Sequence, residues 1–381
     1  MHIKVPKPIF LLFLLQSPLL MAQIWKTVIV LLFLQNFTHA SSSKAIWVVR
    51  DALTSEKTIS DIISNVKQLN CDKIFLQLRA LGSVYYPTNL DIPHKDVNGK
   101  YLKQLFEEAK KNNIEIHVWL NVCYVWSNTK TSFAQNHVLN KVNSAIISPV
   151  NPNIEQEGYF LHPNDKWNLS EVKSIMDELL GLYPVAGFHL DYFRYPKEKI
   201  HTSKLGRTEY LIRYGLDPIE PLTNPAKFIE QRGVESYKYF QETYRNFLRN
   251  ELTTALKDIR SFLKNKNPDI QLSVAVKPNP INAKHQFLQD WVEWLNEDLC
   301  DFVVTMNYSP EISIFMRNMV LANQMADTSR ILIGVATYNI EPADVSERIK
   351  RIKGTSYNGY SLFSYNYIKD RKALFNLLKN K

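Results

Sequence analysis

The chain has 381 residues, of which 45% are apolar, 12% aromatic and 22% charged. This balance is typical of a globular protein and excludes wholesale disorder, a disulfide scaffold and a collagen-like or low-complexity fibre. The three cysteines, Cys71, Cys123 and Cys300, are far apart and form no Cys-x-x-Cys pair, so we expect buried free thiols and neither a disulfide framework nor a zinc site.

The first 40 residues differ in composition from the rest. They contain three lysines, no carboxylate and two apolar runs, at residues 9–15 and 28–34. The second run is too short to span a bilayer and ends in Thr38-His39-Ala40, a small-x-small pattern that a signal peptidase can cut. We therefore expect a signal peptide or leader over residues 1–40, with Met21 as an alternative start, and a secreted or periplasmic mature protein. An uncleaved leader would instead anchor the chain in the membrane.

Without the three leader lysines, the formal net charge falls from +9 to about +6. The basic residues of the mature chain are spread through amphipathic segments and form no block that would follow a phosphate backbone. A solvated surface explains them better than nucleic-acid binding, and an anionic polymer remains compatible with the charge. The oligomeric state is left open.

Eight short apolar runs, rich in β-branched and aromatic residues, alternate with segments in which apolar residues recur with the period of a helix. Such short runs are typical of strands that are covered on both faces in a parallel sheet. Eight strand-helix repeats predict an α/β fold, a single (β/α)8 TIM barrel over residues 41–381. The predicted strands are residues 45–49, 73–78, 115–120, 187–190, 272–276, 302–306, 331–335 and 360–363.

Capping signals mark several of the intervening helices. Thr54 or Ser55 precedes a helix with isoleucines on one face. Asn168, followed by a glutamate three residues later, predicts the start of a second helix, and Gly181 predicts its end. Apolar spacing over residues 247–262 predicts a long helix before the fifth strand.

Two connections, residues 121–167 and 192–227, are longer than such a barrel needs and are rich in polar, proline and aromatic residues. They follow the third and fourth predicted strands. Barrel active sites are built from the loops at the C-terminal ends of the strands. We expect both connections to form a rim that grips the substrate, and neither to be a separate domain.

Side chains alternate along a strand, so the last inward-facing residue of each strand and the first loop residues share one rim. The rim predicted here combines hydrogen-bonding groups with flat aromatic rings, which is what a carbohydrate cleft requires. The candidate substrate-binding residues are Arg50, Gln77, Arg79, His117, Trp119, Asn121, His189, Arg194, Tyr195, Lys277, Asn307, Tyr308 and Tyr338.

Asp191 is the candidate catalytic residue. It ends an apolar strand inside a basic, aromatic mouth, where the pKa of its carboxyl group can be tuned for protonating a glycosidic oxygen. The alternative is a structural aspartate that pairs with a neighbouring arginine or lysine. His117 and His189 fit hydrogen-bonded spacers of the barrel, and a metal site formed by these two histidines and Asp191 has no further ligand in the sequence. We expect no metal and no cofactor.

A series of motifs spans almost the whole mature chain: AIWVVR at 45–50, LQLR at 76–79, HVWLN at 117–121, LHP at 161–163, GFHLDY at 187–192, QDW at 289–291, DFVVTMNY at 301–308 and GYSLFSY at 359–365. In order and spacing they resemble the glycosyl-hydrolase-like family 10 domain, formerly a domain of unknown function. The resemblance implies a TIM barrel and an extracytoplasmic glycoside hydrolase, with relatives that act on peptidoglycan glycan strands stripped of their peptides.

The chain departs from the family pattern at three carboxylates. Many relatives carry Asp-Gly at Ala186-Gly187, a second Asp at Tyr192 and Gly-Asp at Gly82-Ser83. Two-carboxylate hydrolysis needs a pair about 5 to 5.5 Å apart for retention or about 6.5 to 9.5 Å apart for inversion, and no second acid ends a later strand. The remaining candidates lie in loops: Asp51, Glu155, Glu157, Glu198 and Asp217.

One mechanism does not need a second carboxylate. If the substrate carries an N-acetyl group, its carbonyl can act as the nucleophile while Asp191 supplies the proton and Tyr308 or Asn307 steadies the acetamide. The Met306-Asn307-Tyr308 ending is similar to the Met-x-Tyr of family 18 chitinases, by analogy only.

The leading hypothesis is therefore an exported glycoside hydrolase of an amino-sugar polysaccharide, peptide-free peptidoglycan glycan, with Asp191 as general acid. The first alternative is a barrel that only binds a polysaccharide or oligosaccharide. The second is a metal-dependent deacetylase or amidohydrolase.

Overall fold

The computed structural model describes residues 42–53, 55–127, 133–146, 157–197 and 202–379. The predicted leader and Thr54 lie outside the described residues. Ser43–Lys381 form a single unit.

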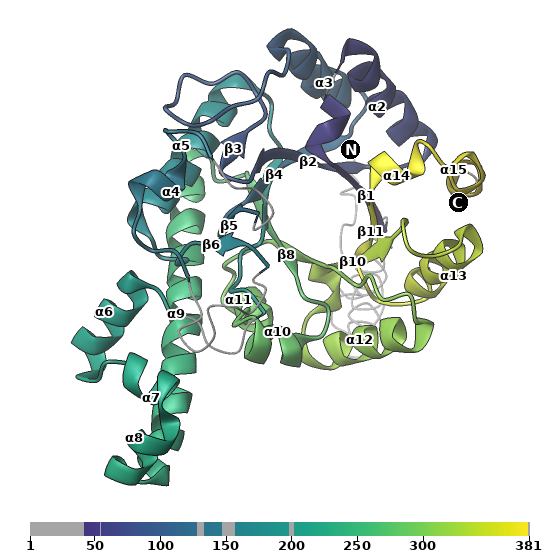
Figure 1. The fold of residues 1–381 in the computed structure, drawn as a ribbon. Coiled ribbons are helices and arrows are strands. Elements are labelled where there is room, and N and C mark those ends of the chain that lie inside the picture. Colours follow the sequence, from purple (N-terminus) through teal and green to yellow (C-terminus); the bar gives the residue numbers. More distant parts are fainter. Residues whose placement is uncertain (1–41, 54, 128–132, 147–156, 198–201, 380–381) are drawn as a thin grey trace, which may run out of the picture. The chain divides into compact units, whose positions relative to one another are not determined.

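Eight parallel strands close into a barrel, in the order β1-β11-β10-β9-β8-β7-β4-β2, with β2 pairing back onto β1 (Figure 1). All eight predicted strands are confirmed, with ends that differ by one or two residues. Strands such as β2, whose eight residues are all buried, are covered on both faces, which explains their unbroken apolar pattern. The strands are β1 Ser43–Val48, β2 Lys73–Ala80, β4 Glu115–Asn121, β7 Gly187–Asp191, β8 Gln271–Val276, β9 Phe302–Thr305, β10 Ile331–Ala336 and β11 Gly359–Phe363.

Helices surround the barrel and cover its outer face (Figure 1). The side chains between strands and helices form the main core, whereas a smaller aromatic core fills the barrel itself. The three cysteines are buried free thiols, as predicted. The main outer helices are α2 Glu56–Gln68, α3 Gly99–Lys111, α5 Lys166–Leu182, α9 Val234–Lys266, α11 Trp291–Asn296, α12 Ile312–Met325, α13 Pro342–Lys353 and α15 Lys372–Lys379.

The predicted helix caps are partly confirmed. Ser55 caps α2, with its side chain accepting from the Thr58 amide and the reciprocal bond also present. The prediction for α5 is wrong at both ends. Asp165 caps this helix, so the predicted cap, Asn168, lies inside the first turn. Gly181 lies inside the last turn, because the apolar face continues and the helix ends only at Leu182.

The two long connections carry structure of their own above the C-terminal ends of β4 and β7. Among its described residues, the first connection has a small antiparallel pair and a short helix. The described part of the second has three helices, of which α6 and α8 pack beside the first half of α9, the part that extends beyond the barrel wall (Figure 1). Their elements are β5 Tyr124–Trp126, α4 Val138–Lys141, β6 Tyr159–Phe160, α6 Lys204–Tyr214, α7 Ile219–Thr223 and α8 Pro225–Arg232. The remaining short elements are η2 Arg50–Leu53, β3 Ser83–Val84, α10 Pro280–Gln286, η3 Thr328–Arg330 and α14 Tyr365–Ile368.

Candidate active site

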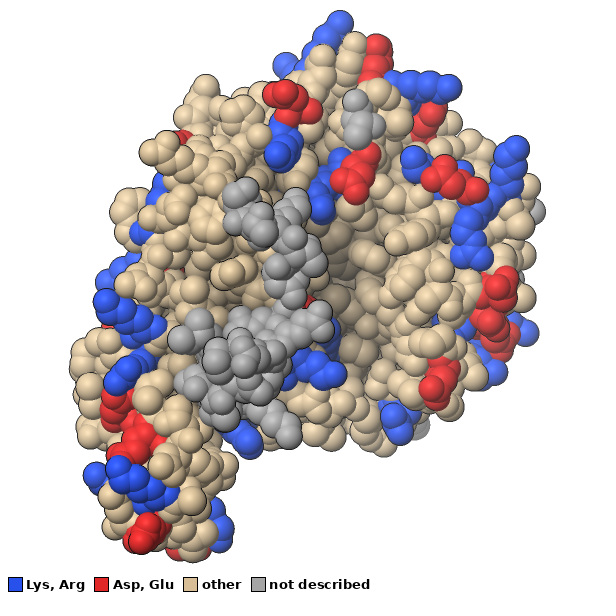
Figure 2. Space-filling view, in the orientation of Figure 1, with Lys and Arg blue, Asp and Glu red and all other residues tan. Residues whose placement is uncertain are grey.

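A pocket of about 570 Å³ opens at the C-terminal ends of the strands. Figure 2 shows this mouth as a hollow in the face of the molecule, with Lys and Arg side chains at its edge. The size is that of a small-molecule or sugar site. Its lining residues are Trp47, Val49, Arg50, Gln77, Ala80, Leu81, Trp119, Asn121, Tyr124, Ser127, Glu157, Asp191, Tyr192, Arg194, Lys277, Met306, Tyr308 and Phe363.

Aromatic rings from three strand ends form the floor. Trp47 and Trp119 meet edge to face with ring centroids 4.7 Å apart, and Phe363 lies 5.8 Å from Trp47. Tyr308 stacks on Phe363 at 5.1 Å. Gly334 in β10 leaves room for this ring, because a Cβ there would lie 3.0 Å from Tyr308 and 2.3 Å from a backbone oxygen. Such a floor suits the apolar face of a sugar ring.

Asp191, the last residue of β7, stands over this floor and is only 6% exposed. One carboxylate oxygen accepts from the indole N–H of Trp119 at 3.1 Å, and the other accepts from the backbone N–H of Tyr192 at 2.7 Å. Tyr192 adopts a left-handed conformation, with φ of 50°, a strained geometry that is common beside functional groups. Burial raises the pKa of Asp191 to about 6, although these donors and the nearby cations oppose the shift.

Two arginines line the polar wall and both have partners. Arg50 donates to Gln77 at 2.7 Å and its guanidinium lies 3.9 Å from the exposed carboxylate of Asp51. Arg194 makes two contacts with Glu157, at 2.6 and 3.1 Å. Arg194 also donates to the Tyr195 carbonyl at 3.0 Å and is only 3% exposed. These contacts fix both guanidinium groups in the pocket wall.

Tyr308 carries a polar group with no visible use in the fold. Its hydroxyl is buried and has no hydrogen-bond partner among the described residues. Burial and, secondarily, the charge of Asp191 raise its pKa well above the usual value, so the hydroxyl stays protonated and is a donor. A buried donor without a partner is energetically unfavourable, and a ligand in this pocket can satisfy it.

Eight of the fourteen residues predicted for the site line the pocket: Asp191, Arg50, Gln77, Trp119, Asn121, Arg194, Lys277 and Tyr308. Tyr338 is not a lining residue, but its 42% exposed ring packs 6.4 Å from that of Tyr308. The other five predicted residues lie away from the pocket.

His117 and His189 face the barrel interior but lie below the pocket. His117 is completely buried near the other end of the barrel, where its ring contacts Lys73 at 3.1 Å and Glu115 at 3.2 Å. His189 bonds Ser273 at 2.7 Å and packs 4.2 Å from Phe75. Along its strand, His117 precedes the end by two inward positions and His189 by one. Trp47 also packs against the His189 ring, with centroids 4.5 Å apart, so other side chains separate both histidines from a ligand.

Arg79 does not face the pocket because β2 carries a bulge. The pairing of β2 with β4 shifts between Gln77 and Arg79, and one extra residue reverses the side of the sheet to which later side chains point. Arg79 is fully buried and pairs with Glu171 at 2.8 Å and with Asn168 at 3.0 Å. It therefore holds α5 against the strands.

Tyr195 and Asn307 are also placed away from the pocket. Tyr195 is 1% exposed and its hydroxyl lies 3.5 Å from His162. Asn307 is 1% exposed, donates to the Phe315 carbonyl at 3.0 Å and accepts from Asn318 at 2.9 Å, so it fixes the start of α12. Of the two residues predicted to steady an acetamide, only Tyr308 lines the pocket.

Several lining residues were not predicted as site residues. Trp47 and Phe363 occupy inward positions of β1 and of the end of β11, a pattern that strict alternation could have revealed. Tyr124 and Tyr192, whose rings stack at 4.6 Å, come from the two long loops, and no periodicity in the sequence indicates their positions.

The loop carboxylates are mostly outside the site. Glu157 lines the pocket, whereas Asp51 is exposed on η2 and Asp217 pairs with Arg207 on the α6 side. Glu155 and Glu198 lie outside the described residues. Within the part of the chain that the structure describes, Glu157 is thus the one carboxylate that shares the pocket with Asp191.

The described residues contain no group of three His, Cys, Asp or Glu side chains placed to hold a metal ion, and the two barrel histidines do not converge with Asp191.

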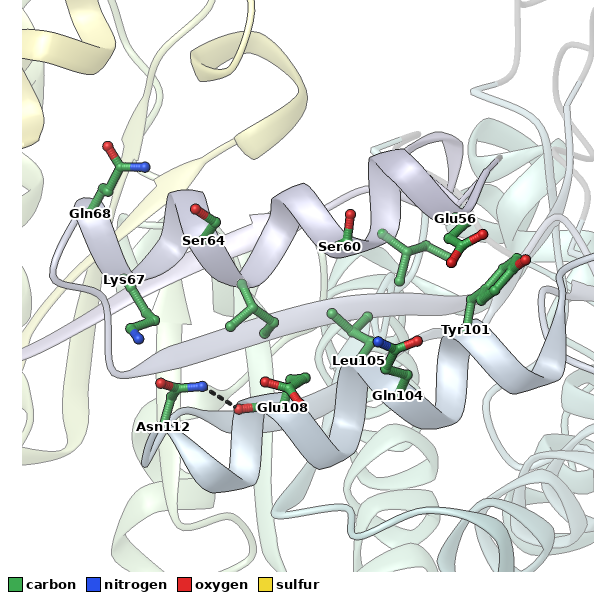
Figure 3. Close-up of a pocket in the computed structure, with 12 residues that line it drawn as sticks. Glu56, Ser60, Ser64, Lys67, Gln68, Tyr101, Gln104, Leu105, Glu108 and Asn112 are labelled. Carbon is green, nitrogen blue, oxygen red and sulfur yellow. Dashed lines mark hydrogen bonds between the residues drawn. The ribbon is translucent and has the colours of Figure 1, made fainter.

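A further hollow, of about 470 Å³, lies on the outer surface between α2 and α3 (Figure 3). It shares no lining residue with the pocket at the strand ends and is lined by solvated helix residues such as Glu56, Lys67 and Gln104. No described helix has the length and apolarity needed to cross a membrane.

The mouth of this (β/α)8 barrel combines a buried carboxyl group, hydrogen-bonding side chains and an aromatic floor, which are the groups that a carbohydrate site requires. The chain belongs to the glycosyl hydrolase-like 10 family, whose model matches residues 40–349. The family resemblance of the motifs is therefore confirmed.

Three similar proteins show how far the chain has diverged in sequence. The chain is 21% identical to a protein of Escherichia coli K12 named glycosyl hydrolase DigH, over 77% of this chain and 69% of the relative. The glycoside hydrolase domain of PgaB (BpsB) from Bordetella bronchiseptica superposes with a TM-score of 0.62 at 14% identity, over 89% of this chain and 99% of that domain. The catalytic domain of a β-amylase from Paenibacillus polymyxa superposes with a TM-score of 0.54 at 12% identity, over 86% of this chain and 93% of that domain. These two structures support the fold.

Proposed function

We propose that the protein is an exported glycoside hydrolase that cleaves an N-acetylated amino-sugar polymer, peptide-free peptidoglycan glycan, with Asp191 as general acid. The observation that carries the proposal is the environment of Asp191: a buried carboxyl group at a strand end, over an aromatic floor, with a pKa raised to about 6. A carboxyl group with such a pKa retains its proton in mildly acidic solution and can transfer it to a glycosidic oxygen. The name of the E. coli relative supports the reaction class.

The nucleophile in this proposal belongs to the substrate. Glu157 is the second described carboxylate of the pocket, and Arg194 holds both of its oxygens. The acetamido carbonyl oxygen attacks the anomeric carbon as the glycosidic bond breaks, and the Asp191 proton goes to the leaving oxygen. The Tyr308 hydroxyl donates to the acetamide and so holds it for attack. Water then opens the cyclic intermediate, with the Asp191 carboxylate accepting a proton from that water.

The pairing of Glu157 with Arg194 also favours a second function. If Glu157 and Asp191 only hold the pocket rim together, the pocket binds glycan without cleaving it. The missing family carboxylates at Ser83, Ala186 and Tyr192 support this alternative.

The test is mass spectrometry of soluble products after incubation of residues 41–381 with peptide-free peptidoglycan glycan, with chitin oligomers and with their deacetylated forms. Asp191→Asn keeps the shape of the side chain and removes the transferable proton. We expect products from N-acetylated substrates and none from that variant. Asp217→Asn, which removes a carboxylate from the α6 side, is the matched control and should retain cleavage.

Two outcomes contradict the proposal. Cleavage at an unchanged rate by Asp191→Asn would remove this residue from the mechanism. Saturable binding without released reducing ends by the unaltered protein would favour the glycan-binding alternative. Export is tested separately by N-terminal sequencing of the protein from the producing cell, where we expect Ser41 as the first residue.

A further inference from the structure

Lys277 is a pocket cation for which the described residues supply no ion-pair partner. It follows β8, lines the pocket with Asp191 and Arg194, and its ammonium lies 4.6 Å from the centre of the Phe287 ring. No described carboxylate lies within ion-pair distance of it, whereas Arg194 has Glu157 and Arg50 has Asp51.

The charges around Lys277 do not supply a partner either. Asp191 directs its oxygens to Trp119 and Tyr192, and Glu157 directs both of its oxygens to Arg194. The backbone groups of Lys277 are fixed, because its N–H donates to Gln289 and its carbonyl accepts from Trp291. The side chain thus starts from a fixed backbone and presents to the pocket an ammonium group that no carboxylate of the described residues pairs with.

A buried or half-buried ammonium without a counter-ion is unfavourable, and an anionic ligand group relieves this. Burial, and secondarily Arg194, lowers the pKa of Lys277 to about 8, which shows how strongly the site disfavours the bare charge. A carboxylate would form a charge-assisted hydrogen bond with it.

We propose that Lys277 binds a free carboxylate of the sugar in the pocket, so that the substrate is an acidic amino sugar. This inference rests on the proposed function, because it assigns the group that the same pocket recognises. A carboxyl group that is joined to a peptide is a neutral amide and cannot form this pair, so removal of the peptide creates the recognised anion. A deacetylated amino sugar carries a positive charge and is repelled by Lys277.

The test compares two substrates that differ in one group: peptide-free glycan oligosaccharides with free carboxylates, and the same oligosaccharides after conversion of each carboxylate to its methylamide. For each we would measure kcat/KM with the unaltered protein, Lys277→Gln, Lys277→Arg and Lys284→Gln. Lys284 lies on α10 outside the pocket and pairs with Asp290 at 2.7 Å, so its variant makes the same change of net charge elsewhere.

We expect the unaltered protein to prefer the carboxylate about 10- to 100-fold, the range for one charged hydrogen bond. Lys277→Gln should bring this ratio close to 1, mainly through KM, while Lys277→Arg and Lys284→Gln retain it. An unaltered protein without preference, or a Lys277→Gln variant that keeps it, would overturn the inference. A role of Lys277 only in setting the pKa of Asp191 would change both rates together and leave the ratio intact, which also overturns it.

Calorimetric binding of the two oligosaccharides to Asp191→Asn separates this inference from the proposed function. If the unaltered protein cleaves neither substrate, hydrolysis fails, and the binding ratio still decides the role of Lys277. A carboxylate preference that disappears when Lys277→Gln is added to Asp191→Asn supports the inference; equal binding of both oligosaccharides contradicts it.

Discussion

Replacement of Asp191 by asparagine is expected to make the folded protein more stable at pH 8, although it removes a residue proposed for catalysis. The pKa of this carboxyl group is raised from 3.8 to about 6 in the folded state. A difference of about 2 pKa units corresponds to about 3 kcal/mol of destabilisation once the group is ionised in both states. The penalty is absent below about pH 4, where both states are protonated, grows between pH 4 and 6, and is constant above.

The substitution also removes one interaction. Asp191 accepts hydrogen bonds from Trp119 and from the Tyr192 amide through different oxygens. Asparagine has one acceptor oxygen, so one of these two hydrogen bonds is lost. The loss is at most about 1 kcal/mol, because the Trp119 N–H also donates to the side-chain oxygen of Asn121 at 2.9 Å. When the lost hydrogen bond is subtracted from the removed charge penalty, Asp191→Asn gains about 1 to 2 kcal/mol in free energy of unfolding at pH 8. At pH 4, where the charge penalty is absent, the variant gains no stability.

Equilibrium unfolding in urea at pH 4 and at pH 8 measures the difference in free energy of unfolding between Asp191→Asn and the unaltered protein at each pH, provided that the slope m is the same for both proteins. Asp301→Asn is the control with the opposite sign. Burial acts to raise the pKa of Asp301, but two contacts with Arg260, at 2.5 and 2.8 Å, hold it below its usual value. This control should lose stability at pH 8. A loss of stability by Asp191→Asn at pH 8 would refute the reasoning, because the carboxylate would then be favourably solvated or paired.

Three further predictions concern single residues. Tyr308→Phe should have a free energy of unfolding within about 0.5 kcal/mol of that of the unaltered protein, because the hydroxyl has no partner among the described residues. The same variant should lower kcat/KM for N-acetylated oligosaccharides about 10- to 100-fold, and equal kinetics in the two proteins would contradict the role of the hydroxyl. The rate of cleavage should fall about tenfold per pH unit above pH 6, as Asp191 loses the proton that it must donate, and a pH profile of kcat/KM that is flat up to pH 8 would exclude it as the acid. Arg79→Met should cost about 3 to 5 kcal/mol in urea unfolding, because it leaves the carboxylate of Glu171 unpaired in a mostly buried position; a loss below about 1 kcal/mol would show that this pair does not hold α5.

The pH dependence of substrate preference offers a further check on Lys277. The groups that face it are the cations Arg194 and Lys197 and the carboxylates Glu157 and Asp191. Since the pKa of Lys277 is lowered to about 8, its charge is present below that pH and is lost above it. Preference for the carboxylated oligosaccharide, measured as a ratio of Kd values for Asp191→Asn, should therefore decline above about pH 8. A ratio that is constant from pH 6 to pH 10 would contradict this.

The barrel could be predicted from the sequence because its strands leave a local signal. A strand covered on both faces must be apolar throughout, and a helix packed on it must be apolar on one side, so the alternation of periods encodes the architecture. The same logic placed Gln77, Trp119, Asp191 and Lys277 at one rim, since each lies in an inward-facing position at or near the C-terminal end of its strand.

The tertiary structure decided the details that depend on depth, register and distant partners. A bulge between Gln77 and Arg79 turns the arginine away from the pocket, and alternation cannot reveal an inserted residue. The sequence does not show which layer of the barrel holds His189, because that depends on how far each strand extends beyond its neighbours.

The electrostatic character of the site was also beyond the sequence. The pKa of Asp191 depends on its burial beside residues remote along the chain, such as Trp119. Lys277 has no counter-ion among the described residues, because Glu157, 120 positions earlier in the chain, is held by Arg194. The sequence by itself determined the barrel and most of its rim, since local periodicity encodes both. Only the tertiary structure decided which charges meet, since charge pairing depends on distances between residues that are remote along the chain.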